Sequence, residues 1–243
     1  MAVRERLDLW MVSHGLVESR TKAQALIMAG EVFVDGQKAV KPGQATGEDS
    51  RVEVATKLKY VGRGGFKLEG ALEGFGIDVR GFVCADFGSS TGGFTDCLLQ
   101  LGAVRVHAID VGTNQLDWRL RSDRRVVVRE GVNARHLEPD DLGEYVDLAV
   151  CDVSFISATM IVPAMAGVLK SNGRMVVLVK PQFEVGRDHV GKGGIVRETE
   201  LHAESCAKVR ECVEALGFET GMMESPITGA EGNKEFLLYA FRK

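Results

Sequence analysis

A glycine-rich stretch at residues 85–96, A-D-F-G-S-S-T-G-G-F-T-D, is the strongest chemical signal in the sequence. The apolar run V-C-A leads into it and a helical pattern follows it, which predicts a strand, a tight turn and a helix. Glycine lets a ligand approach the backbone closely, and Asp110 ends the next predicted strand, where such folds bind ribose hydroxyls. The stretch therefore predicts a nucleotide-like ligand, and an ordinary strand–helix turn without a ligand is the alternative.

The spacing of these glycines favours S-adenosylmethionine (SAM) over other nucleotide cofactors. The dinucleotide motif G-x-G-x-x-G is not met because Ser90 stands where the second glycine would be. No Gly-Lys-Ser/Thr follows, as a phosphate-binding loop would require, and SAM has no phosphate to bind. We expect Asn133 on the adenine side and Asp152 on the methionine side. The predicted SAM-binding residues are Asp86, Gly88, Ser89, Ser90, Thr91, Gly92, Gly93, Phe94, Asp110, Asn133 and Asp152.

Two other predicted strands end in charged residues that could act on a substrate. C-D-V-S-F places Asp152 at one strand end, and V-L-V-K-P-Q-F places Lys180 at another. Strand ends of this kind face the crevice where doubly wound sheets bind ligands. Partial burial lowers the pKa of a lysine and makes it a possible base. As alternatives, Asp152 could cap the next helix and Lys180 could extend to solvent.

The elements that must position these residues alternate between strands and helices after about residue 64. We predict a Rossmann-like α/β fold with a mostly parallel, seven-stranded sheet. The expected strands are 83–88, 104–112, 125–131, 146–155, 174–183 and two final strands in T-G-M-M-E-S-P-I and K-E-F-L-L-Y-A-F-R.

The residue pattern of the N-terminal segment differs and predicts two helices followed by a hairpin with its turn at Asp35-Gly36. Residues 1–63 carry ten Lys/Arg and eight Asp/Glu, a net charge of +2, in a chain whose net charge is -4. We therefore expect a small α+β domain at 1–60, a linker at 61–66 and the Rossmann-like domain at 67–243.

Composition excludes several other classes of protein. The 243 residues are 45% hydrophobic and 26% charged, which is typical of globular proteins. The five cysteines are widely spaced without any C-x-x-C, so neither a disulfide framework nor a metal site is expected. No uncharged run of membrane-spanning length and no leader pattern occur, and we expect a cytoplasmic protein.

Motifs along almost the whole chain resemble one family. Residues 1–60 resemble the small RNA-binding domain named after ribosomal protein S4, and residues 61–243 resemble the FtsJ-type ribose methyltransferases. Together with G-R-G-G-F-K-L-E-G-A-L, D-W-R-L-R, D-V-S-F-I-S, L-V-K-P-Q-F-E-V-G-R and G-N-K-E-F-L-L, they resemble the TlyA family. That family comprises SAM-dependent rRNA 2′-O-methyltransferases that act on cytidines, and its members are often labelled haemolysin.

The resemblance implies a catalytic Lys-Asp-Lys-Glu tetrad. By motif it falls on Lys67, Asp152, Lys180 and Glu235. Lys180 is then the candidate for orienting and deprotonating the 2′-hydroxyl, and the charge of Lys67 would disfavour a second positive charge nearby. Asp152 and Glu235 would orient the two lysines. The chain ends soon after its last strand, which resembles the shorter members and favours a target in the large subunit.

The expected partner is rRNA or a ribosomal subunit, with no metal and no membrane. Phosphate contacts are expected from Arg4, Arg6, Arg20, Lys22, Lys38, Lys41 and Arg63, although each could simply be a solvated surface charge. Three alternatives are a membrane-lytic protein, a non-catalytic RNA-binding factor and a small-molecule SAM enzyme. The lack of an apolar span argues against a membrane-lytic protein. The intact tetrad argues against a non-catalytic factor, and the RNA-binding domain argues against a small-molecule enzyme.

Overall fold

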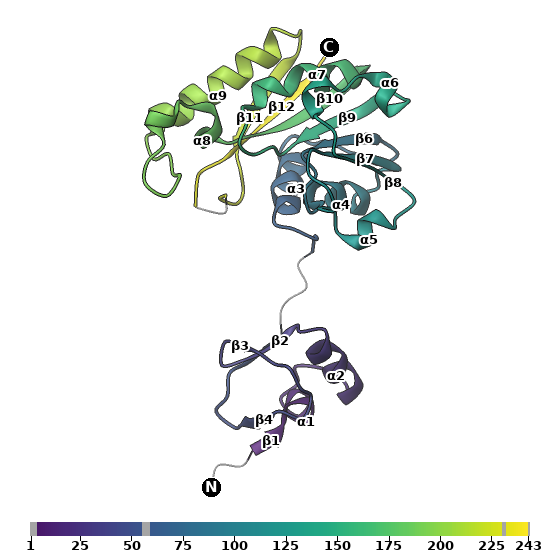
Figure 1. Cartoon of the computed structure of the whole chain (residues 1–243), viewed down its shortest axis with the longest axis vertical. Helices are drawn as coiled ribbons and strands as arrows, with labels where there is room; N and C mark the ends of the chain where they lie inside the picture. The colour runs from purple at the N-terminus through teal and green to yellow at the C-terminus, as the bar shows by residue number, and fades with distance from the viewer. Residues whose placement is uncertain (1–3, 55–58, 230–231, 243) are drawn as a thin grey trace. The chain divides into compact units, whose positions relative to one another are not determined.

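A computed structural model describes residues 4–54, 59–229 and 232–242 of the chain. The chain divides into two compact units, Met1–Leu58 and Lys59–Lys243 (Figure 1). Each unit has its own apolar core, which is the physical condition for folding as a separate domain. Residues 55–58, within the expected first domain, lie outside the described residues.

The first unit combines two helices with short strands. Its elements are β1 (Arg4–Arg6), α1 (Leu7–Ser13), α2 (Arg20–Met28), β2 (Val32–Val34), β3 (Gln37–Lys38), β4 (Ala45–Gly47) and β5 (Val52–Val54). Leu7, Met11 and Ile27 from the helices pack with Val32 from β2 in its core. The predicted helices and hairpin are confirmed, and the hairpin residues Asp35 and Gly36 have φ angles of 52° and 78°. Strands β1 and β4 were not predicted, because three residues are too few to show an alternating pattern.

The second unit is built on one seven-stranded sheet. Its strand order is β11-β12-β10-β9-β6-β7-β8, with β12 antiparallel to both neighbours and the other pairs parallel. This confirms the predicted Rossmann-like architecture. The strands are β6 (Val83–Phe87), β7 (Arg105–Asp110), β8 (Val126–Glu130), β9 (Val146–Cys151), β10 (Leu169–Val179), β11 (Glu219–Glu224) and β12 (Phe236–Phe241).

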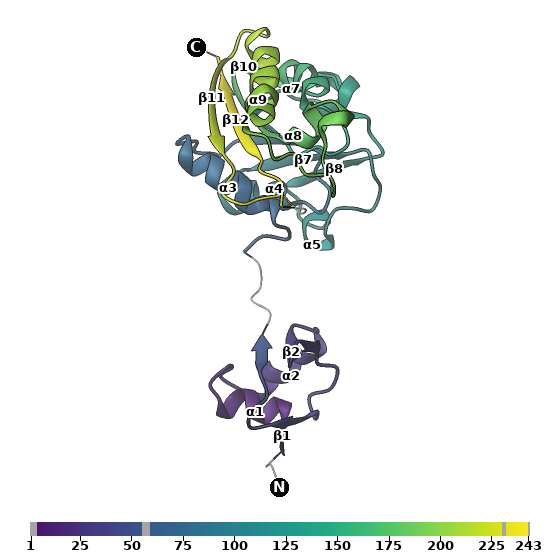
Figure 2. The same cartoon turned by 90° about the vertical axis from the view of Figure 1, so that its left-hand side faces the viewer.

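Helices cover both faces of this sheet, as Figures 1 and 2 show. On one face Met165 of α7 and Val213 of α9 pack against Phe87 and Cys151. On the other face Leu68 of α3 and Leu98 of α4 join a second apolar cluster with the sheet. The helices are α3 (Gly64–Gly74), α4 (Gly93–Gln100), α5 (Trp118–Arg121), α6 (Pro139–Leu142), α7 (Val162–Val168), α8 (Pro181–Glu184) and α9 (Thr199–Glu214).

Two strands differ from their expected bounds by four or more residues, and both differences affect the site. The strand expected at 146–155 ends at Cys151, and the one expected at 174–183 runs from Leu169 to Val179. The stretch at 157–173, S-A-T-M-I-V-P-A-M-A-G-V-L-K-S-N-G, predicts a helix that ends at Gly173, but α7 ends at Val168 because Leu169 pairs with Val146 ahead of an irregularity in the ladder. Asp152 and Lys180 therefore follow their strands instead of lying within them.

The segment expected as a linker, 61–66, is part of the second unit. Helix α3 begins at Gly64, and the Val61 N–H donates a 2.8 Å hydrogen bond to Asp96 of α4. The Tyr60 ring is buried against the backbone of Gly65, where a Cβ atom would lie 2.3 Å from the ring. Glycine at 65 thus permits a close contact that fixes the start of α3.

Candidate active site at the carboxyl edge of the sheet

The glycine turn lies between β6 and α4, as predicted. Gly88 has φ 82°, and a Cβ atom there would lie 2.9 Å from the Asp152 carbonyl oxygen. Gly92 has φ 97°, and a Cβ atom there would lie 2.3 Å from the Leu120 side chain. Both glycines are required by conformation and by space, so the turn is held tightly against its neighbours.

Asp110, at the end of β7, closes this turn. Its carboxylate accepts hydrogen bonds of 2.7 Å from the backbone N–H of Ser90 and of Gly112. Each carboxylate oxygen has lone pairs left for another donor. The arrangement fits a carboxylate that also accepts from ribose hydroxyls.

Three cavities adjoin at this edge of the sheet. The first, of about 500 Å³, is mostly apolar and includes Asp110, Val132, Asn133, Ile156 and Ile161. The second, of about 160 Å³, is lined by Asp86, Ser89, Thr91, Gly93, Asp152 and Lys180. The third, of about 430 Å³, is lined by Lys67, Lys180, Phe183, Val190, Asn233 and Glu235. Ser154 lines all three.

Asp86 supplies an unusual buried carboxylate to the second cavity. It is fully buried, and its Oδ2 accepts a 2.7 Å hydrogen bond from Thr95. Its Oδ1 has no hydrogen-bond partner among the described residues. Burial, together with the charge of Asp152, raises the pKa of Asp86 to about 7, although the hydrogen bond from Thr95 acts in the opposite direction. An acceptor without a partner in a ligand-sized cavity fits the ammonium group of an amino acid.

Lys180 lines the second and third cavities, beside Ser154, which lines all three. Its Nζ lies 2.5 Å from Asp152 Oδ1 as an ion pair without hydrogen-bond geometry, and it donates to Ser154 Oγ at 2.9 Å. The lysine and the aspartate follow the parallel neighbours β10 and β9, whose carboxyl ends meet at this edge. Both side chains are largely shielded from water.

Lys67 and Glu235 form a second ion pair in the third cavity. Lys67 Nζ donates to Glu235 Oε2 at 2.5 Å, and both side chains are buried. Register explains how Glu235 reaches Lys180: Val179 pairs with Phe236, so the two residues lie just beyond the last pair of β10 and β12. The structure thus brings all four predicted tetrad residues to one edge.

Three residues that sequence reasoning missed support the site. Ser154, within the D-V-S-F motif, accepts the hydrogen bond from Lys180. Asn233 is buried, donates to the Gly194 carbonyl at 2.8 Å and accepts from the Val196 N–H at 3.0 Å, which holds a loop beside the third cavity. Glu184 of α8 is the third, and it accepts hydrogen bonds from Ser157 and Ala158. Asn233 belongs to the G-N-K-E-F motif, which could have pointed to it.

Glu184 connects the loop after Lys180 to the loop after Ser154. It is buried, and it accepts from Ser157 Oγ at 2.5 Å and from the Ala158 N–H at 2.6 Å. Lys208 of α9 lies 3.1 Å from the same carboxylate. A single acid five residues after the end of a strand gives no sequence signal for this role.

The basic residues expected to contact RNA are distributed over both units. Arg6 and Arg20 both donate to the buried Asp8 carboxylate, at 3.0 and 2.9 Å. The Arg6 guanidinium holds the pKa of Asp8 well below its usual range. Lys22 pairs with Glu18, whereas Arg4, Lys38 and Lys41 are exposed. Arg63 belongs to the second unit and donates to the Thr228 carbonyl at 3.0 Å.

Two kinds of feature are absent from the part of the chain that the structure describes. None of its helices has the length and apolar character needed to cross a membrane. Its His, Cys, Asp and Glu side chains form no group of three or more that could hold a metal ion.

The fold and the site define a Rossmann-type methyltransferase with an N-terminal RNA-binding module. Residues 60–242 match the FtsJ-like methyltransferase family, and residues 5–52 match the S4 domain. The chain belongs to the TlyA family, as its curated relatives show.

Three similar proteins illustrate this membership. The Mycobacterium tuberculosis "16S/23S rRNA (cytidine-2'-O)-methyltransferase TlyA" is 47% identical over 98% of this chain and 90% of its own length. The Campylobacter jejuni "23S rRNA (cytidine-2'-O)-methyltransferase TlyA" is 32% identical over 96% of this chain and 98% of its own. A solved structure from Streptococcus thermophilus that carries the name hemolysin is 43% identical, with a TM-score of 0.75 over 100% of this chain and 90% of its own.

Proposed function

We propose that this protein transfers a methyl group from SAM to the ribose 2′-hydroxyl of a cytidine in rRNA. The observation that carries the proposal is the meeting of three cavities at Ser154, whose hydroxyl accepts a hydrogen bond from Lys180. The first cavity suits an adenosine, the second an amino-acid group, and the third an acceptor beside Lys180. Family membership and the names of the relatives support the same reaction.

The predicted cofactor residues fit SAM on structural grounds. Asp110 would accept from the ribose hydroxyls, and Asn133 would lie beside the adenine in the largely apolar first cavity. Asp86 Oδ1 would accept from the methionine ammonium in the second cavity. Asp152 would lie on the methionine side, next to the reacting centre. When bound, SAM supplies the methyl group on a sulfonium, which needs an acceptor in line with the bond that breaks.

Lys180 would act on the acceptor hydroxyl. A ribose hydroxyl is a poor nucleophile, and its oxygen gains from losing the proton as the new bond to carbon forms. After Lys180 has lost a proton to solvent, its amine would replace its contact with Ser154 by one to the 2′-hydroxyl, hold the oxygen in place and accept the hydroxyl proton. Asp152, 2.5 Å away, would fix the amine and stabilise the ammonium that results.

Lys67 and Glu235 would position the acceptor. Their ion pair lines the same cavity as Lys180, beside the space that the acceptor would fill. The pair would also form the wall against which the ribose rests.

The first unit would add RNA affinity without chemistry. It matches the S4 domain, and its exposed Lys38 and Lys41 can contact phosphates. We favour a target in the large subunit, because the Campylobacter jejuni relative, named for 23S rRNA, matches over nearly its whole length.

Mapping of ribose methylation in rRNA tests the proposal. We expect a 2′-O-methylcytidine in 23S rRNA from cells that contain the protein and none at that position in cells that lack it. Restoration by wild type but not by Lys180→Ala would tie the mark to the site. An unchanged methylation map, or a mark on a base, would contradict the proposal.

A further inference from the structure

An exposed tryptophan stands at the start of α5. Trp118 is 75% exposed, whereas Trp10, the other tryptophan of the chain, is buried in the first unit. Single exposed apolar side chains are common on protein surfaces, so the exposure of Trp118 matters only together with its position and its charged neighbours.

Direct contacts fix α5 to the glycine turn. The Asp117 N–H donates to the Thr91 carbonyl at 3.1 Å, and Thr91 lines the second cavity. Leu116 and Leu120 lie against Gly92, where they fill the space that a Cβ atom would need. Trp118 is therefore held at the same edge of the sheet as the candidate active site, outside the three cavities.

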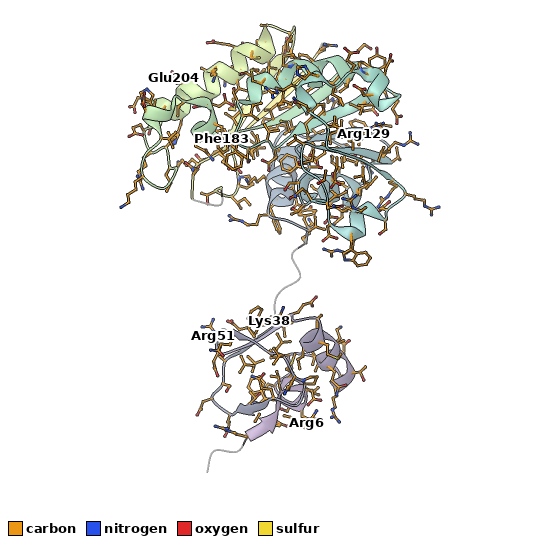
Figure 3. The ribbon with its side chains drawn as sticks, viewed as in Figure 1. Arg6, Lys38, Arg51, Arg129, Phe183 and Glu204 are labelled. Atoms are coloured by element: carbon orange, nitrogen blue, oxygen red, sulfur yellow. The ribbon has the colours of Figure 1, made fainter. Side chains whose placement is uncertain are left out.

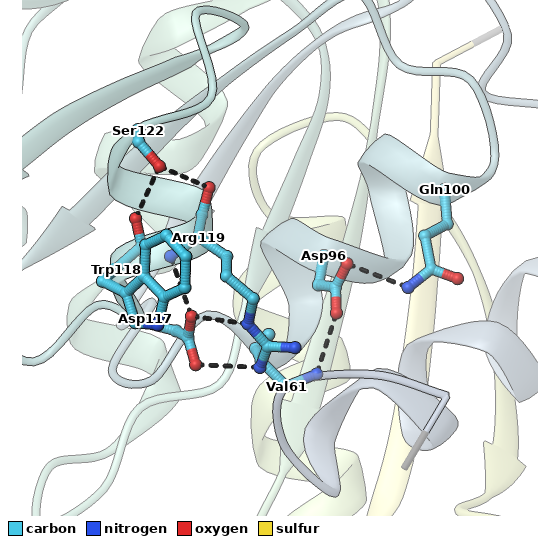
Figure 4. Close-up of polar contacts among 7 residues, drawn as sticks. All are labelled: Val61, Asp96, Gln100, Asp117, Trp118, Arg119 and Ser122. Carbon is cyan, nitrogen blue, oxygen red and sulfur yellow. Dashed lines mark hydrogen bonds and ion pairs between the residues drawn. The ribbon is translucent and has the colours of Figure 1, made fainter. Parts of the chain in front are cut away.

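The helix holding the indole is short but well fixed, as Figure 4 shows. Asp117 accepts from the Arg119 backbone N–H at 2.9 Å and from its guanidinium at 2.9 and 3.0 Å. Ser122 Oγ donates to the Trp118 carbonyl at 2.8 Å. The Arg119 side chain extends from α5 towards Val61 and Asp96, and its guanidinium is about half exposed.

The surroundings of Trp118 are locally basic. Residues 117–125 contain four arginines and two aspartates, a net charge of +2 in a chain of net -4. Arg119, Arg121 and Arg124 are exposed. Ion pairs to Asp117 and Glu130 hold the first two in place and use only part of their N–H groups.

We propose that Trp118, Arg119, Arg121 and Arg124, which we name the Trp118 platform, bind unpaired substrate RNA. One base would stack on the indole, and the arginines would contact neighbouring phosphates. Indole stacking accepts any base and is worth about 1–3 kcal/mol. The proposal deepens the proposed function and rests on it, because it names a surface beside the cavities that holds the RNA.

Substitutions at Trp118 test the platform through affinity for RNA. The RNA used is the target that wild type methylates, either a 23S rRNA transcript or an unmethylated large subunit. Trp118→Ala should weaken RNA binding by about 5- to 150-fold, as loss of one stack implies. Trp118→Tyr keeps an aromatic ring and should stay within a few fold of wild type. SAM affinity and the thermal midpoint should not change in either variant.

Tyr145→Ala is the matched control. Tyr145 is 54% exposed but directly precedes β9, at the opposite edge of the sheet. This variant should bind RNA like wild type. Equal losses in Trp118→Ala and Tyr145→Ala, or no loss in Trp118→Ala, would overturn the platform. A loss in Trp118→Ala confined to protein partners of the subunit, with naked rRNA bound normally, would assign the surface to a protein and overturn it too.

Fluorescence gives a direct reading of the stack. Trp10→Phe leaves Trp118 as the remaining tryptophan. Provided that this variant binds RNA as tightly as wild type does, RNA should quench the Trp118 emission. RNA binding without quenching would refute stacking. If wild type binds rRNA and quenches but adds no methyl group to ribose, the platform stands and the proposed function fails. If Trp118→Ala methylates ribose normally, the proposed function stands and the platform fails.

Discussion

The buried Asp86 should make the stability of the second unit depend on pH in an unusual direction. Its pKa is raised from 3.8 to about 7, mainly because burial disfavours the charged form. Between these two values the unfolded chain has lost the proton and the folded chain retains it. The unfolded state therefore binds fewer protons, so the free energy of unfolding falls as pH rises from about 4 to about 7.

The magnitude follows from the size of the shift. A difference of about 3 pKa units corresponds to roughly 4 kcal/mol over the full window. Asp86→Asn keeps the shape and can still accept from Thr95, but it has no proton to lose. Relative to this variant, wild type without SAM should lose on the order of 3 kcal/mol between pH 5 and pH 8.

Urea unfolding of both proteins at several pH values measures this difference. The relevant transition is the one that SAM shifts, which separates the second unit from the first. SAM should oppose the effect, since its ammonium favours the Asp86 carboxylate, and wild-type SAM affinity should rise with pH up to about 7. A difference between the two proteins that stays constant with pH would refute the reasoning, because a change in packing alone does not titrate.

Three further predictions concern the cofactor, the base and the RNA. Asp110→Asn should weaken SAM binding by about 10- to 150-fold in calorimetry, because bonds to a charged acceptor are worth about 1.5–3 kcal/mol; unchanged affinity would remove Asp110 from the site. Lys180→Ala should lower the methyl-transfer rate by about 10²–10⁴ while SAM still binds, and Lys180→Arg should not restore it; near-normal turnover would contradict the role of Lys180. Charge reversal at Lys22, Lys38 and Lys41 should reduce rRNA affinity and its salt dependence, measured by filter binding, and an unchanged salt slope would assign the first unit another role.

The N-terminal lysines are better probes than the neighbouring arginines for a structural reason. Arg6 and Arg20 are expected RNA contacts, but each also donates to the buried Asp8. Reversing either charge would place a negative side chain against the buried Asp8 carboxylate and destabilise the first unit. Loss of RNA binding in such a variant would not distinguish contact from unfolding.

Much of the fold could be predicted because its local signals agree with one another. Apolar strands of five or six residues with glycine turns define β6, β7 and β9, and Asp35-Gly36 defines the hairpin of the first unit. The limits of α7 and β10 could not be predicted, since pairing of Leu169 with Val146 overrides the helical pattern. Tertiary contacts decide such boundaries, and single-sequence patterns do not contain them.

The candidate site was predictable where a residue lies at a strand end or in a motif. Asp110, Asp152 and Lys180 follow this rule, because carboxyl ends of parallel strands meet at one edge. Glu184 and Asn233 escaped prediction, since they act by holding loops that only the folded chain brings together. Trp118 escaped for another reason: its side-chain exposure cannot be read from the four residues of α5.

Methyl transfer to an RNA with a single 2′-deoxycytidine at the target tests the central claim most directly. The mapped position is first identified with native RNA, and the two RNAs then differ by one oxygen atom. With radiolabelled SAM, we expect the native RNA to accept one methyl group and the deoxy RNA to accept none, although both bind equally. Equal labelling of the deoxy RNA would place the methyl group on the base and contradict ribose methylation by this site.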